Sequence, residues 1–199
     1  MRKFFLAGAM IAACALPALA PAPAAANLLV NGSFETGDLS GWSFTGNTGL
    51  TFVELTPFVY GAEDGKYYLY AGPIGSDGVL SQSFVDTPGQ TLLVSGWLAG
   101  DGTSPSDFRM SFDGITHVSV DPVPAQGYRR YSFKVAGTGL DTFSIAFRND
   151  PSWDGIDNLS VIGVAGGVPE LGTWAMMIIG FGGIALRLRR RPRATEIPA

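Results

Sequence analysis

The chain has 199 residues, one histidine, one cysteine and a formal net charge of −4 at pH 7. Residues 27–165 include six basic and fifteen acidic side chains, a net charge of −9, which disfavours nucleic acid as a partner. With a single histidine and no nucleophile motif, serine-histidine, cysteine-histidine and histidine-zinc chemistry are excluded, so we predict no catalytic residue. Glycoside hydrolysis by a pair of carboxylates stays open, because the distance between the two groups in space, which the sequence does not give, decides whether they can act together.

The first 26 residues have the layout of a secretory signal peptide. Two basic residues precede an apolar stretch over 4–19, and Ala24 and Ala26 form a small-residue cleavage site. We therefore predict cleavage after Ala26 and export of the remaining chain. An alternative takes Cys14 as the lipidated residue of a lipoprotein, because residues 11–14 resemble a lipobox. If Cys14 leaves with the signal peptide, the exported chain has no disulfide.

Residues 27–162 alternate apolar and polar side chains in short runs separated by Gly, Pro, Asp and Asn. Phe108, Met110 and Phe112 share one face of such a run, as strands with one buried and one wet face require. The expected strands are 28–31, 42–45, 50–55, 67–71, 79–85, 92–99, 107–112, 116–120, 131–135, 142–148 and 156–162. This pattern predicts an all-β, antiparallel β-sandwich, most plausibly a jelly roll.

Several stretches of this segment resemble galactose-binding-like jelly rolls, the fold of many carbohydrate-binding modules. Residues 27–35, followed by the Gly-Trp pair at 41–42, are similar to the opening strand of that group. Residues 78–84 and 88–97 resemble its central strands, and 156–161 its last strand. The resemblance implies a binding or structural domain in place of an enzyme.

The resemblance also implies a structural calcium ion where the first and last strands meet. Calcium binds carboxylate, amide and backbone oxygens. Asn31, Glu35 and Asp157 are the candidate ligands, and Asp157 falls on the expected inward face, where a lone carboxylate needs a partner. The alternative is that Glu35 and Asp157 accept hydrogen bonds from turn amides.

Exposed aromatic rings could stack on the rings of a sugar. Trp153 lies in the polar loop 149–154, and Tyr67 and Tyr68 point to opposite faces of one strand. Trp153 and Tyr68 are therefore the predicted glycan-stacking residues. The alternative is that these aromatics fill the core, which aromatic residues commonly do.

The C-terminal part has the order of a membrane segment. A linker over 163–168 leads into an uncharged run over 171–186, followed by an arginine-rich stretch over 187–193 and a tail over 194–199. The run has 16 residues, about 24 Å as a helix, which is short for a hydrocarbon core of about 30 Å. The arginines place their end in the cytoplasm and the β-sandwich outside.

Residues 169–193 resemble the PEP-CTERM sorting signal of Gram-negative bacteria. The motif over 169–174 departs from the family at Leu171, where a second proline is usual. The matching residues are Pro169, Glu170, Trp174, Ala175, Met176, Met177, Gly180, Phe181, Gly182, Arg187, Arg189, Arg190 and Arg191.

This second resemblance implies an exosortase as processing partner, transient anchoring in the inner membrane, and delivery to the cell surface or a biofilm matrix of polysaccharide. The sequence therefore predicts an exported, non-enzymatic surface or matrix protein. The alternative is a carbohydrate-binding module with a discrete sugar-stacking site.

Overall fold

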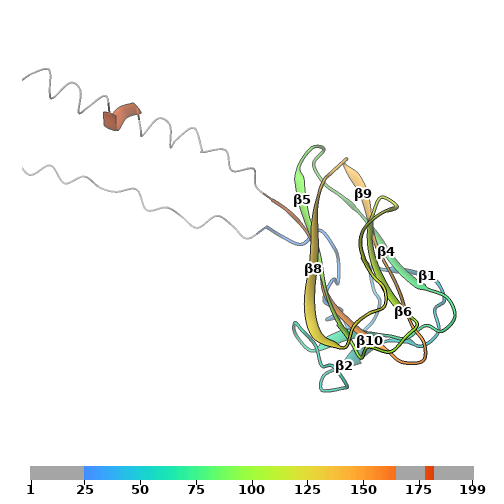
Figure 1. Ribbon diagram of the computed structural model, residues 1–199. Helices are drawn as coiled ribbons and strands as arrows, with labels where there is room; N and C mark the ends of the chain where they lie inside the picture. Colours follow the sequence, from blue (N-terminus) through green and yellow to red (C-terminus); the bar gives the residue numbers. More distant parts are fainter. Residues whose placement is uncertain (1–24, 165–177, 182–199) are drawn as a thin grey trace, which may run out of the picture.

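The computed structural model describes residues 25–164 and 178–181 (Figure 1). Residues 25–164 form ten strands in two antiparallel five-stranded sheets. The strands are β1 (Ser43–Gly46), β2 (Thr51–Leu55), β3 (Tyr67–Ala71), β4 (Gly78–Val85), β5 (Thr91–Gly100), β6 (Ser106–Phe112), β7 (Ile115–Val120), β8 (Gln126–Ala136), β9 (Leu140–Asn149) and β10 (Asp154–Gly163).

The two sheets pack face to face as a sandwich. The first sheet has the order β1-β4-β9-β6-β7, and the second sheet has the order β2-β3-β10-β5-β8. β4 and β5 follow each other in sequence but lie in opposite sheets, as do β7 and β8, and β8 and β9. The chain thus crosses repeatedly between the sheets, and the predicted all-β jelly-roll sandwich is confirmed.

The core lies between the sheets and follows the predicted alternation. Phe108 and Met110 of β6 are fully buried and stand opposite Phe147 and Ile145 of β9. Leu98 of β5 is buried in the facing sheet. Because all of these side chains come from residues 29–161, the sandwich encloses its own hydrophobic core.

The predicted strand over 28–31 is wrong. Only Asn27 forms an isolated bridge, with Ile162, and the following residues form turns. Asn31 adopts a φ of 54°, in the left-handed region, and its amide donates hydrogen bonds to the carbonyls of Asp38 and Ser40. The local side-chain bonds and the left-handed φ together stabilise a turn here in place of an extended strand.

Residues 178–181 form a short helical segment that includes Gly180 and Phe181 of the predicted sorting signal. Among the residues that the structure describes, no helix has the length and apolar character needed to cross a membrane. The signal peptide with Ala24, and the other sorting residues, lie outside the described residues, so these assignments stay predictions.

Candidate functional site

Five aromatic rings gather at one end of the second sheet, on the face turned away from the core. We call this group, formed by Phe52, Phe58, Tyr60, Tyr70 and Trp153, the aromatic shelf. Phe52 of β2 stands directly opposite Tyr70 of β3, and these two side chains share the outer face. Trp153 immediately precedes β10, whose first residue pairs with the last residue of β3. The shelf is thus assembled from two strands and two loops.

Ring contacts centre on Tyr70. Its ring stacks on Trp153 with centroids 5.2 Å apart and an interplanar angle of 8°. Phe58 meets Tyr70 edge to face at 5.2 Å, and Tyr60 lies 6.4 Å away. Phe52 and Phe58 remain 49% and 46% exposed. Since large apolar rings normally avoid water, two half-exposed rings beside three partly buried ones indicate a binding surface.

The loop over 56–66, here called the strap, crosses the outer face of the second sheet and carries Phe58 and Tyr60. The hydroxyls of Tyr68 and Tyr128 donate to the strap carbonyls of Phe58 and Gly61, both at 3.0 Å. The hydroxyl of Tyr60 donates to the carbonyl of Trp153 at 2.8 Å. These three bonds fix the strap to the sheet and to the loop that carries Trp153.

The prediction that Tyr68 is an exposed stacking residue is wrong, whereas Trp153 belongs to the shelf. Tyr68 does lie on the outer face of β3, but the strap covers it and leaves none of its surface exposed. Burial accordingly raises the pKa of Tyr68 to about 12. Its role is therefore to hold the strap.

Carboxylates border the shelf. Asp101, which follows β5, accepts hydrogen bonds from the backbone N–H and the hydroxyl of Thr103. Asp154 is almost fully buried, and one of its oxygens accepts a 2.9 Å bond from the Asn149 amide while the other has no hydrogen-bond partner. Burial raises the pKa of Asp154 to about 7, against the opposing effect of the Asn149 bond, with the charge of Asp101 adding to the rise.

The negative charges of these carboxylates act on two tyrosines of the shelf. The pKa of Tyr70 is raised, first by burial and then by the negative charges of Asp101 and Glu54. The pKa of Tyr60 is raised by burial and by the charges of Asp101 and Asp154. The shelf therefore combines apolar stacking surfaces with carboxylate acceptors at its border.

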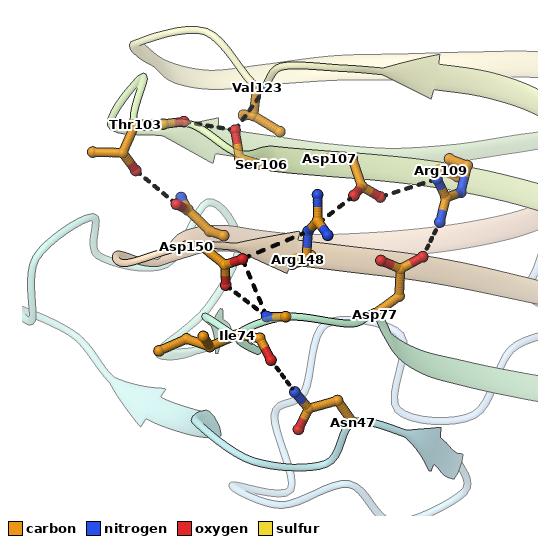
Figure 2. Close-up of polar contacts among 12 residues, drawn as sticks. Asn47, Ile74, Asp77, Thr103, Ser106, Asp107, Arg109, Val123, Arg148 and Asp150 are labelled. Atoms are coloured by element: carbon orange, nitrogen blue, oxygen red, sulfur yellow. Dashed lines mark hydrogen bonds and ion pairs between the residues drawn. The ribbon is translucent and has the colours of Figure 1, made fainter.

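A network of charged residues on the first sheet holds the loop that carries Trp153 (Figure 2). Arg148 of β9 lies 3.5 Å from Asp107 and 4.0 Å from Asp150, and Asp150 accepts the backbone N–H of Gly75 at 2.9 Å. Arg109 forms ion pairs with Asp107 and with Asp77. The loop before β10 is thereby tied to the loop between β3 and β4.

The side-chain oxygens of the predicted calcium ligands accept hydrogen bonds from backbone N–H groups. One oxygen of Asp157 accepts the N–H groups of Glu63 and Asp64, and the other accepts that of Asn158 at 2.6 Å. Glu35 accepts the N–H groups of two residues at the start of β3, both at 2.8 Å.

The amide oxygen of Asn31 accepts from the N–H of Thr36 at 3.2 Å. Within residues 25–164 and 178–181, no three His, Cys, Asp or Glu side chains gather as metal ligands. The geometry matches the alternative of turn-amide bonding, and calcium binding stays a prediction.

Sequence reasoning missed Phe52, Phe58 and Tyr60 as shelf residues. A signal was available, because the segment 52–70 contains six of the aromatic residues of the chain. An aromatic density of this kind exceeds what one face of a strand pair can place in the core, so some of the rings must lie on the outer face.

Comparison with known proteins identifies similar folds but no family to which the chain belongs. No protein-family model matches the chain, and no curated protein matches it. TmCBM61, solved in complex with β-1,4-galactotriose, is similar with a TM-score of 0.58 at 19% identity, over 70% of this chain and 99% of that chain. A xylan-binding domain of CBM22 is similar with a TM-score of 0.51 at 16% identity, over 72% and 99%.

A third similar structure comes from an enzyme. The enzymatically active domain of tailspike protein 4 of bacteriophage CBA120 matches with a TM-score of 0.53 at 14% identity, over 69% of this chain and 21% of that chain. At these identities the likeness establishes the jelly-roll fold of carbohydrate-binding modules and no more.

Proposed function

We propose that the β-sandwich is a non-catalytic carbohydrate-binding module that binds a neutral polysaccharide through the aromatic shelf. The observation that supports it is the stack of Trp153 on Tyr70 beside the half-exposed Phe52 and Phe58. Flat rings of this kind match the apolar faces of pyranose sugars, and Asp101 at the border can accept bonds from sugar hydroxyls. Two of the similar structures are sugar-binding modules, which agrees with this role.

Preference for a neutral ligand follows from the carboxylates. Asp101, Asp154 and Glu54 lie close enough to the shelf to act on its tyrosines. Of the basic residues, Arg109 and Arg148 form ion pairs on the other sheet, and Lys66 is the one basic residue of the strap. A uronate about 10 Å from one such carboxylate is repelled by about 0.4–1.7 kcal/mol, depending on the effective dielectric constant. Because the pKa of Asp154 is about 7, Asp101 and Glu54 supply most of this repulsion at neutral pH, and together they disfavour an acidic polymer by several-fold.

The predicted address belongs to the same proposal. We infer that the chain is exported, held transiently in the inner membrane by residues 169–193 and released to the cell surface or matrix by an exosortase. The sequence resemblance of that segment supports this address, and a polysaccharide-rich matrix would supply the ligand.

A glycan array probed with the full chain in mild detergent tests the binding. It includes β-1,4-galactan and xylan as neutral polymers and polygalacturonate as the acidic one. Truncating one stacking ring should remove about 2 kcal/mol, or about thirtyfold in affinity. Trp153→Ala and the milder Phe58→Ala should both weaken retention of the neutral polymers.

His117→Ala is the matched control, because this exposed ring also stacks on an aromatic neighbour, Phe133, at 4.4 Å but lies outside the shelf. Equal binding by all three variants, or absence of binding to every polymer on the array, would reject the shelf as the site. Stronger retention of polygalacturonate than of the neutral polymers would reject only the preference for neutral ligands.

A further inference from the structure

Both ends of the described chain leave the sandwich at one place. Asn27 bridges Ile162 near the end of β10, and the N–H of Leu28 bonds to the carbonyl of Val161 at 2.8 Å. The N–H of Val164 bonds to the carbonyl of Thr91 at the start of β5, also at 2.8 Å. Figure 1 shows the two ends next to each other beside β5.

The aromatic shelf lies at the opposite end. β10 begins at Asp154, directly after Trp153, and its ten residues end at Gly163. Asp154 pairs with the last residue of β3, whereas Gly163 pairs with Leu92 near the start of β5. At about 3.3 Å per residue, the strand separates the shelf from the chain exits by about 30 Å.

We propose that attachment at the C-terminal end, by the membrane segment before processing or by the receiving surface after it, leaves the shelf facing outward, so that the domain bridges the surface that carries it and a glycan. The proposal rests on the function proposed above and adds an orientation to it. Any attachment made through either terminus leaves the shelf at the far end of the sandwich. A shelf at the exit end would instead face the membrane, and an extended polymer could not reach it.

Charge supports the same orientation. The segment 27–165 carries a net charge of −9, so an anionic membrane surface repels the domain and disfavours its lying flat. Carboxylates lie at both ends of the sandwich, with Asp101 and Asp154 beside the shelf and Asp86, Asp113 and Asp141 near the exits, so the tether is what selects the outward end. Tethered at one end, the domain is expected to stand with the shelf outward.

The test measures whether a polymer can reach the shelf on a membrane-bound chain. The only cysteine, Cys14, is replaced by serine in the full chain, and single cysteines are introduced as Phe58→Cys at the shelf or Val164→Cys at the exit. Each protein is reconstituted in vesicles of phosphatidylethanolamine and phosphatidylglycerol. Labelling by a high-molecular-weight dextran maleimide is compared between vesicles and detergent, which normalises for local reactivity.

We expect Phe58→Cys to be labelled at the same rate in vesicles and in detergent, and Val164→Cys to be labelled several-fold more slowly in vesicles. Shielding of Phe58→Cys in vesicles would overturn the proposal, as would failure of the full chain to float with the vesicles. Because this readout involves no glycan, it can fail while the array succeeds. Absence of binding on the array would overturn the proposed function, and the bridge with it.

Discussion

Asp154 provides a sharp test of the electrostatics beside the shelf. Its carboxyl is almost fully buried, one oxygen has no hydrogen-bond partner, and its pKa is raised from 3.8 to about 7. A carboxyl with a raised pKa in the folded state binds its proton more tightly there than in the unfolded chain. The stability of the fold therefore falls as the pH rises from about 4 to about 7, because the buried group must then ionise.

The size of the effect follows from the shift in pKa. A shift of about 3 units corresponds to about 4 kcal/mol, since each unit is worth about 1.4 kcal/mol. Asp154→Asn has no proton to lose and keeps an oxygen to accept the bond from Asn149. At pH 4, where Asp154 is neutral, variant and wild type should be equally stable. By pH 8 the variant should be more stable by up to about 4 kcal/mol.

Denaturant titrations of both proteins between pH 4 and 8 measure this difference. Subtracting the two free energies of unfolding removes the contributions of titratable groups common to both proteins. Asp157→Asn is the contrast, since burial also raises the pKa of Asp157 to about 7 but its oxygens accept three backbone N–H groups. An amide there faces donors and should destabilise the fold at every pH. A difference for Asp154→Asn that does not change with pH would refute this reasoning.

Three further predictions concern packing, metal and processing. Gly72→Ala places a Cβ 2.5 Å from Trp153, so it should lower the unfolding free energy by about 1–3 kcal/mol and weaken glycan binding. Gly127→Ala has open space around its Cβ and should change neither the stability nor the binding; thermal melts measure the first and the glycan array the second. Calcium coordinated by Asp157 should raise the melting temperature at millimolar concentrations over EDTA, and equal melting would exclude it. Mass spectrometry of protein from its native surface should find a C-terminus near Glu170, and a retained arginine cluster would contradict processing.

The sheets could be predicted because their information is local. Alternation in a single run placed Phe108 and Met110 on one face, and both are fully buried. The error at 28–31 also has a local cause. The side chain of Asn31 bonds to its own loop and so stabilises a turn in place of a strand, and the alternation of apolar and polar residues does not reveal such a bond. Strands with one buried and one solvent-exposed face are thus the part of this fold that the alternation of apolar and polar residues predicts well.

The site could not be predicted as a site because its parts are distant in sequence. Phe52 and Trp153 are separated by about half the chain, and only the pairing of β3 with β10 brings them to one end of the sheet. Tyr68 shows the same limit in reverse. Strand parity correctly placed it outside the core, but parity contains no information about the strap that covers it.

The strap explains why a surface of this kind can be a binding site and remain stable in water. Tyr68 and Tyr128 hold it from β3 and β8, and the buried carboxylate of Asp157 accepts two of its N–H groups from β10. The rings it carries are therefore ordered before any ligand arrives, so binding does not have to supply the entropy of ordering them. Because the restraints come from the outer face of the sheet, the core beneath contributes only apolar packing. The shelf and the core are thus built on opposite faces of the same strands, and shelf rings can change with the ligand without loss of the fold.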